Sequence, residues 1–188
     1  MKKITSIICS SLILLCSGCA SMKQEESLGT NSPLDACKML TQNRDWMVAT
    51  HNAYLKWGIP VSVQLSVIKH ESSFNRDASA TTSSAYGYAQ ALNNTWNEYK
   101  KETGNKTASR GSFFDSTDFI GWYWSKVAGS VKLSPYDAGD FYLAYHEGIG
   151  GFQKRSYLKK RWLMRKAKNV QSIANRYRFQ INKCRIKI

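Results

Sequence analysis

The sequence predicts an all-α, mainly helical fold, and three observations support this prediction. Apolar residues recur every three or four positions along several segments, which is the spacing of one face of a helix. Typical helix starts and ends are present, among them a serine–proline pair at 134–135 and glycines at 58 and 104. No stretch shows the convincing alternation of apolar and polar residues that a half-buried strand has. We therefore expect one domain of helices and loops.

The expected helices follow one another along the chain. Ser32 and Ser134 are predicted N-caps, each followed by proline at the first helical position, and Asp115 or Ser116 is predicted to cap a helix between them. Between residues 72 and 91 the helical pattern is lost, so a loop or a short irregular hairpin is expected there. The predicted helical segments are 32–40, 43–58, 60–71, 94–104, 115–127, 134–148 and 156–183.

Apolar residues on these segments define the expected core. The third segment has an apolar side with Leu65 and Ile68, and a polar stripe that includes Ser62 and Ser66. The last segment is expected to keep one apolar face made of Leu158, Trp162, Val170, Ile173, Ala174, Tyr177 and Ile181. The tryptophans assigned to the core are Trp46, Trp57, Trp122, Trp124 and Trp162.

The first nineteen residues have the composition of a secretory signal peptide. Lysines at 2 and 3 precede an apolar stretch over residues 4–15, which is too short to span a membrane. The small residues before Cys19 resemble the lipobox of bacterial lipoproteins, although Cys16 stands where an aliphatic residue is usual. We therefore expect a signal peptide over residues 1–19 and lipidation of Cys19. A plain signal peptide with incidental cysteines is the alternative.

The remaining chain divides into a tether and a domain. Residues 20–31 are small and polar, which suits a short tether. Residues 32–188 are enough for one domain with a hydrophobic core. Because Ala20 follows Cys19, no aspartate marks retention at the inner membrane, and we expect an outer-membrane lipoprotein that faces the periplasm.

The cysteines predict one disulfide. Cys9 and Cys16 lie in the signal peptide and Cys19 is the expected lipid acceptor, so Cys37 and Cys184 remain. An even pair in an oxidising compartment indicates a disulfide, here joining the two ends of the domain. Two free thiols are the alternative. A metal site needs more ligands than are in view, so no metal is expected.

The charge is unevenly distributed. The net charge is +14, and residues 151–188 contain thirteen Lys or Arg and no acid. Nucleic acid is the usual partner of such a segment, but an exported lipoprotein rarely meets it, so no nucleic-acid partner is expected. Anionic lipid headgroups and the acidic peptides of the cell wall are nearer targets. A solvated face of the last helix is the simpler interpretation.

Glu71 ends the third predicted helix, in the stretch "IKHESSFN". On a helix it lies one turn after Val67 and Ile68, which are both apolar, and away from the polar stripe. A carboxyl at the edge of an apolar patch has its charged form disfavoured, which raises its pKa. That is the condition for a general acid near neutral pH. An ordinary solvated helix end is the alternative.

Three short motifs follow one another from Glu71 onward. They are Glu71-Ser72, the stretch "GYAQ" at 87–90 and the stretch "AYHEG" at 144–148. In order and rough spacing they resemble the Glu-Ser, Gly-Leu-Met-Gln and Ala-Tyr-Asn-Ala-Gly motifs of the soluble lytic transglycosylases, lysozyme-like enzymes that cleave bacterial peptidoglycan. The stretches "SSAYGYAQAL", "DFIGWY" and "YLAYHEG" further resemble a subgroup of small lipoproteins, which extends the resemblance to most of the mature chain.

The resemblance implies a lysozyme-like fold and a single catalytic acid, Glu71. In the family this acid protonates the glycosidic oxygen between N-acetylmuramic acid and N-acetylglucosamine. It then takes a proton from the C6 hydroxyl, which attacks C1 and leaves a 1,6-anhydro ring. The implied substrate is the glycan strand of peptidoglycan, and no cofactor, metal or nucleophilic side chain is required.

Several motif residues have a functional and a structural interpretation. Ser72 assists anhydro-ring formation or caps the helix end. Gln90 bridges the loop and the sugar or satisfies the loop backbone. Tyr145 hydrogen-bonds Glu71 or the substrate's acetamido group, or it is a buried core aromatic. Tyr86 and Tyr88 offer ring faces for sugar stacking or pack against the loop.

Departures from the family motifs bear on the reaction. Gly87 matches the family glycine, but Ala89 replaces methionine, and His146 and Glu147 replace asparagine and alanine. If Glu147 lies opposite Glu71, a hydrolytic mechanism with two carboxylates follows. If it points outward, the single-acid scheme holds, and we favour this interpretation.

Two other functions remain open from the sequence. One is a wall-binding or scaffold lipoprotein with the same fold and a reshaped cleft. The other is a basic envelope protein that uses residues 151–188 on anionic lipid and has no catalytic role.

Overall fold

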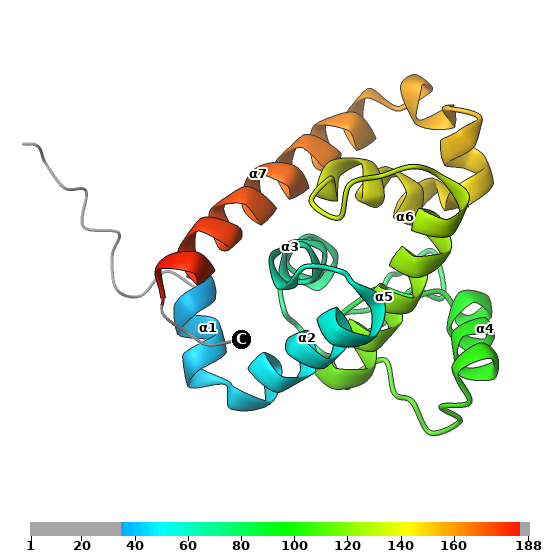
Figure 1. Cartoon of the computed structure of the whole chain (residues 1–188). Helices are drawn as coiled ribbons and strands as arrows, with labels where there is room; N and C mark the ends of the chain where they lie inside the picture. Colours follow the sequence, from blue (N-terminus) through cyan, green and yellow to red (C-terminus); the bar gives the residue numbers. More distant parts are fainter. Residues whose placement is uncertain (1–34, 185–188) are drawn as a thin grey trace, which may run out of the picture. The chain divides into compact units, whose positions relative to one another are not determined.

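The computed structural model describes residues 35–184, which form seven α-helices and one short 3-10 helix (Figure 1). The prediction of an all-α fold is confirmed, because the described residues contain only isolated β-bridges and no strand. The helices are α1 (Ala36–Gln42), α2 (Arg44–Trp57), α3 (Val61–Ser72), α4 (Asn93–Thr103), α5 (Phe113–Ser130), α6 (Ala138–Gln153), η1 (Ser156–Lys159) and α7 (Arg161–Lys183).

Helix α3 is the central helix of the fold. It contacts α2, α5, α6 and α7, and Figure 1 shows it end-on among them. Residues 61–68 are buried without exception, so the polar stripe with Ser62 and Ser66 does not face water. Buried polar groups need hydrogen-bond partners. The Gln64 amide donates to the carbonyl oxygens of Thr50 and Ile59 at 2.9 Å each, which ties α3 to the middle of α2 and to the turn after it.

Three predicted helix starts are displaced in the structure. Asp35 is the N-cap of α1, and its side chain accepts a hydrogen bond from the Lys38 amide. The helix therefore begins after Asp35, later than the predicted start at Ser32. Ser112 caps α5 in place of Asp115 or Ser116, because its hydroxyl accepts from the Asp115 amide. In the third case Asp137 is the N-cap of α6, and Ser134 lies in a turn before it.

The last predicted helix is interrupted. A short 3-10 helix, η1, precedes α7, and Arg155 before it has a left-handed backbone with φ of 55°. Val170, Ala174 and Tyr177 are buried as expected, but Leu158 is 54% exposed and Trp162 is 42% exposed. The assignment of these two side chains to the apolar face, and of Trp162 to the core, is therefore wrong. Of the other assigned tryptophans, Trp122 and Trp124 are buried and Trp46 and Trp57 are partly buried.

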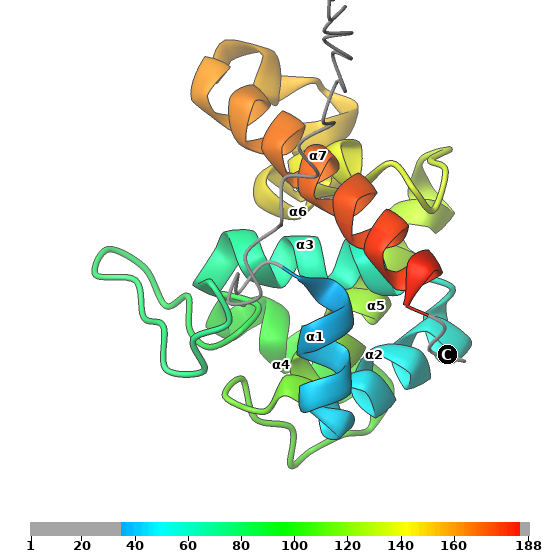
Figure 2. The ribbon, with the colours of Figure 1, turned by 90° about the vertical axis from the view of Figure 1, so that its left-hand side faces the viewer.

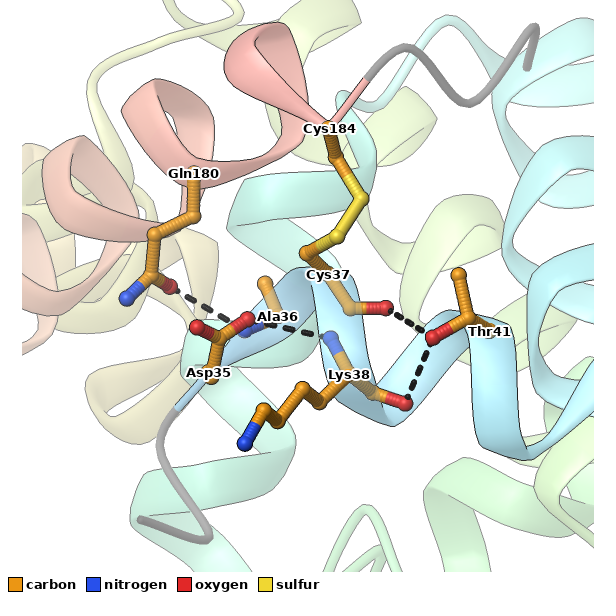
Figure 3. Close-up of a disulfide and its surroundings, with 7 residues drawn as sticks. All are labelled: Asp35, Ala36, Cys37, Lys38, Thr41, Gln180 and Cys184. Atoms are coloured by element: carbon orange, nitrogen blue, oxygen red, sulfur yellow. Dashed lines mark hydrogen bonds between the residues drawn. A yellow bond between two sulfur atoms is a disulfide. The ribbon is translucent and has the colours of Figure 1, made fainter. Parts of the chain in front are cut away.

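The disulfide expected from the sequence is present in the structure. It joins Cys37 on α1 to Cys184 at the end of α7, with 5.7 Å between the Cα atoms (Figure 3). Beside it, the Ala36 amide donates to the Gln180 side chain at 3.0 Å. Both links hold α1 against α7, so the first and last described helices are fixed side by side.

The predictions for the signal peptide, Cys19 and the tether lie outside the described residues. Within residues 35–184, no helix is both long and apolar enough to cross a membrane.

Replacing Cys37 by serine tests the contribution of the disulfide. The bridge closes a loop over a sequence separation of 147 residues. We expect its loss to lower the free energy of unfolding by about 3–5 kcal/mol, because the unfolded chain regains the entropy that the closed loop removes. Denaturant unfolding of the variant and of the reduced wild type measures this loss. Equal stability of all three forms would contradict the prediction.

Candidate active site

Glu71 lies in the last turn of α3, where the central helix leaves the core. The two residues after the helix, Ser73 and Phe74, both have left-handed backbones with φ of 50° and 65°. This turn sends the chain into the long loop over residues 73–92, which projects from the helices in Figure 2. Glu71 therefore stands between residues 61–68 of α3, which are buried, and a loop that is largely exposed.

The surroundings of Glu71 favour its protonated form. Burial of the carboxyl raises its pKa from the ordinary value to about 7, although a hydrogen bond from Tyr142 and the positive charge of Lys166 both act in the opposite direction. Desolvation disfavours a carboxylate, whereas a donor and a cation stabilise it. A carboxyl with a pKa near 7 can both give and accept a proton at neutral pH.

Tyr142 on α6 is a partner of Glu71 that the sequence motifs did not indicate. Its side chain is 2% exposed, and its ring stacks on His70 with 5.2 Å between centroids. Burial, followed by the charge of Glu71 and the hydrogen bond to it, raises the pKa of the Tyr142 hydroxyl well above its ordinary range. Tyr142 lies three residues before Tyr145, so helical spacing places both on one side of α6. This spacing is the sequence feature from which Tyr142 could have been predicted as a site residue.

Tyr145 holds the loop against α6. Its hydroxyl donates a 2.7 Å hydrogen bond to the carbonyl oxygen of Ala89, and its ring packs edge-on against Tyr123. Burial and the nearby charge of Glu71 raise the pKa of the Tyr145 hydroxyl, so this residue also lies near the acid. The Tyr145 hydroxyl is therefore hydrogen-bonded to the loop backbone, and it is close enough to Glu71 for the charge of that carboxyl to act on it.

The loop is fixed by hydrogen bonds to its own backbone. The Gln90 side-chain amide donates to the carbonyl oxygens of Ala78 and Gly87 at 2.9 Å each. Gly87 has φ of 76°, and a Cβ there would lie 2.0 Å from the Arg110 carbonyl oxygen, so only glycine fits. Arg110 also donates to the carbonyl oxygen of Ala91 at 2.8 Å. Gln90 thus has the structural role in the loop backbone that was one of its two interpretations.

A pocket of about 280 Å³ opens beside this loop. The loop, α4, α5 and α6 all contribute to its wall, and Tyr145 connects it to the surroundings of Glu71. Its lining residues are Gln90, Ala91, Leu92, Thr95, Phe119, Tyr123, Tyr145, His146, Glu147 and Gly148.

Tyr145 on α6 thus links the glycine-containing loop, through Ala89, to the surroundings of Glu71 at the end of α3. The chain matches the family described as "Transglycosylase SLT domain" over residues 7–184. The chain belongs to this family. None of the curated proteins compared with the chain matches it. Membership supports a peptidoglycan-lytic activity of the transglycosylase type and a lysozyme-like, mainly helical fold.

Three further site candidates of the transglycosylase domain have structural surroundings. Ser72 is buried, and its hydroxyl donates to the Ile68 carbonyl oxygen one turn earlier at 3.2 Å. Tyr86 donates to the Asp77 carboxylate at 3.0 Å and remains partly exposed. Tyr88 is 8% exposed and packs edge-on against Trp46 and Phe113. We therefore withdraw Tyr88 as a sugar-stacking residue, because its ring belongs to the core.

Glu147 is bound within the transglycosylase domain and is not free to act as a second acid. Lys160 donates to its carboxylate at 2.7 Å, and the hydroxyl of Ser156 donates to the other oxygen. These bonds lower the pKa of Glu147 to about 2. The Glu147 side chain is only 4% exposed, and its ion pair joins α6, just before the non-helical Gly148, to the N-cap residue of α7. The favoured interpretation that Glu147 points outward is therefore wrong, because its side chain forms a structural ion pair within the fold.

No group of residues in the described part of the transglycosylase domain, 35–184, could hold a metal ion. The groups of the candidate site that can exchange or donate a proton are the Glu71 carboxyl and the hydroxyls of Tyr142 and Tyr145.

Replacing Glu147 by glutamine tests its structural role. Because its folded pKa of about 2 lies below the ordinary value of 4.5, ionised Glu147 stabilises the fold above about pH 4.5, and this contribution is lost as the pH falls toward 2. We expect Glu147→Gln to lower the free energy of unfolding at pH 7 by about 1 kcal/mol and to leave catalysis intact. The difference from the wild type should shrink below pH 4.

Denaturant unfolding at several pH values measures this effect. Glu98→Gln is a matched control, because Glu98 pairs with Lys126 but is 49% exposed. An equal effect of both substitutions at pH 7, or loss of activity in Glu147→Gln without loss of stability, would contradict the structural role.

Proposed function

We propose that this protein is a lytic transglycosylase that cleaves the β-1,4 bond between N-acetylmuramic acid and N-acetylglucosamine and leaves a 1,6-anhydro product. The observation that carries the proposal is the desolvated carboxyl of Glu71 at the end of α3, with its pKa raised to about 7, in a chain of the transglycosylase SLT family. The loop that contains Gly87 and Gln90 forms one side of the adjoining pocket.

The first chemical step needs an acid. At neutral pH a substantial fraction of Glu71 is protonated, because its pKa lies near 7. The protonated carboxyl gives its proton to the glycosidic oxygen as the bond to C1 breaks, and N-acetylglucosamine leaves as an alcohol. The acetamido carbonyl of the muramyl residue is positioned by the substrate itself to shield the cationic carbon. Tyr142, which hydrogen-bonds Glu71, stabilises the carboxylate that this step produces.

The second step needs a base at the same place. The Glu71 carboxylate accepts the proton of the C6 hydroxyl, whose oxygen attacks C1 and closes the 1,6-anhydro ring. The proton balance is complete, because the acid that was lost in the first step is restored in the second. A pKa close to the working pH suits a group that performs both roles.

The position of Glu147 favours this scheme over hydrolysis. A hydrolase of the usual type uses a second carboxylate as nucleophile or as base for water. Glu147 is the second carboxylate that the sequence offered, and its oxygens are bound by Lys160 and Ser156. The groups that shift the pKa of Glu71 are Tyr142 and Lys166, together with burial.

Product analysis tests the proposal. Protein that lacks residues 1–19 is expected to release muropeptides that end in 1,6-anhydromuramic acid from purified sacculi, and Glu71→Gln is expected to lower this release by at least about 100-fold because the proton donor is lost. The glutamine variant should remain folded. It should also be more stable than the wild type above pH 7, since ionisation of the buried carboxyl destabilises the fold as the pH rises from 4.5 through 7.

Mass spectrometry of the released fragments distinguishes the outcomes. Reducing-end muramic acid in place of the anhydro form would show a hydrolase. Binding to sacculi without any release by the wild type would show a wall-binding protein of the same fold.

We also propose that the chain is exported and attached to the outer membrane through lipid on Cys19. The sequence of residues 1–19 supports this location, as does the disulfide between Cys37 and Cys184, because disulfides persist mainly in oxidising compartments. The anchor would hold the domain over the glycan strands in the periplasm.

Metabolic labelling tests the anchor. Cells that express the wild type are expected to incorporate labelled palmitate into the protein and to retain it in the outer-membrane fraction. Cys19→Ala should lose both the label and the membrane association, whereas Cys16→Ala should keep them. Labelling of the Cys19 variant would contradict the assignment of this cysteine.

A further inference from the structure

An exposed lysine on α7, Lys166, is close enough to Glu71 for its charge to act on the carboxyl. The ammonium of Lys166 lies over the ring of Trp162, one helical turn earlier, at 5.4 Å from the ring centroid. Trp162 is 42% exposed and packs edge-on against His146 of α6, with 5.1 Å between centroids. An aromatic ring attracts a cation over its face, so Trp162 is a platform that holds Lys166 in place.

The positive charge of Lys166 acts on the end of α3. It lowers the pKa of both His70 and Glu71, which are adjacent in sequence. The groups around Glu71 are thus His70 on α3, Tyr142 and Tyr145 on α6, and Lys166 on α7. Among these groups, Lys166 is the cation, and it comes from α7, the last described helix.

Lys166 has no acidic partner in the described structure. Among residues 35–184, no carboxylate lies within ion-pair distance of it, whereas Lys160 nearby is paired with Glu147. A solvated surface lysine is the simplest explanation of such a residue. However, a free cation beside Glu71 stabilises the ionised acid and so works against its protonation. This cost disappears when an anion binds the lysine.

We propose that Lys166, held on Trp162, binds a carboxylate of the muramyl residue in the glycan strand. This inference rests on the proposed function, because it takes peptidoglycan as the substrate. The muramyl residue carries a lactyl carboxyl, which is either free or linked to a stem peptide with carboxylates of its own. Both sources offer the same chemistry, and a neutral glycan of N-acetylglucosamine offers neither.

Carboxylate binding would also change the acid. When the substrate neutralises Lys166, the cation no longer favours the ionised form of Glu71. The pKa of Glu71 then rises, and the carboxyl is more fully protonated in the complex that needs a proton donor. Lys166 thereby couples recognition of the muramyl carboxylate to the protonation of Glu71, and Trp162 is a positioning residue.

Binding measurements in an inactive background test the proposal. The full chain with Glu71→Gln is titrated calorimetrically with three glycans: strands with stem peptides, strands stripped of peptides by an amidase, and a neutral chitin oligosaccharide. Adding Lys166→Gln is expected to weaken binding of a carboxylate-bearing glycan by about fivefold and to leave chitin binding unchanged. Lys166→Arg should retain most of the affinity, because it keeps the cation.

The glycan that responds identifies the source of the carboxylate. A loss confined to peptide-bearing strands assigns the stem peptide, and a loss confined to stripped strands assigns the lactyl group. Arg165→Gln is the matched control, because Arg165 is an exposed cation next to Lys166 in the sequence. Arg165 lies two residues before the buried Ala167, so it is on the side of α7 nearly opposite to that buried residue. No loss on either anionic glycan, or an equal loss on chitin, would overturn the proposal.

Direct titration of the Glu71 carboxyl by NMR gives a second readout that does not depend on activity. Lys166→Gln and Trp162→Ala are both expected to raise the pKa of Glu71, the first because the cation is lost and the second because its platform is lost. Arg165→Gln should leave that pKa unchanged. An unchanged pKa in Lys166→Gln would overturn the inference. Absence of anhydro product from the wild type would instead reject the proposed function and leave the binding results to stand by themselves.

Discussion

Four helices pack around α3, and this packing removes the carboxyl of Glu71, in the last turn of α3, from most contact with water. Helix α3 is buried on every side over residues 61–68, and Glu71 lies in the turn that follows them. A helix that was exposed on one face would place this carboxyl in water and return its pKa to the ordinary range. The packing of α2, α5, α6 and α7 around α3 is therefore part of the chemistry as well as of the stability.

The two glutamates of the sequence motifs show how surroundings assign roles. Burial raises the pKa of Glu71 to about 7, whereas Lys160 and Ser156 lower that of Glu147 to about 2. One group is therefore prepared to exchange a proton at neutral pH, and the other remains a charge that binds α6 to the start of α7. Carboxyl groups whose surroundings separate their pKa values in this way perform different functions.

The fold and the position of the acid were predictable from the sequence because they depend on local patterns. The apolar spacing, the glycine at 58 and the acid after Val67 and Ile68 all act within one or two helical turns. Helix starts were less predictable, because Asp35, Ser112 and Asp137 each compete with a nearby residue that has similar capping ability. The choice between them depends on where the preceding chain has to go.

The contacts that tune the acid could not be predicted, because they join residues far apart in the sequence. In the sequence, the position of Tyr142 in α6 looks like that of any other buried residue of the helix. Trp162 and Lys166 likewise fit the ordinary amphipathic spacing of a surface helix. Only the packing of α6 and α7 on α3 brings Tyr142 and Lys166 near Glu71. The opposing effects on this carboxyl then have separate origins. Its burial is a property of the core, its hydrogen bond comes from α6, and the charge that favours its ionised form comes from α7. Because that charge lies on an exposed side chain, a bound anion can neutralise it without disturbing the core, so the charge is a separable contribution to the pKa of Glu71 whereas burial is not.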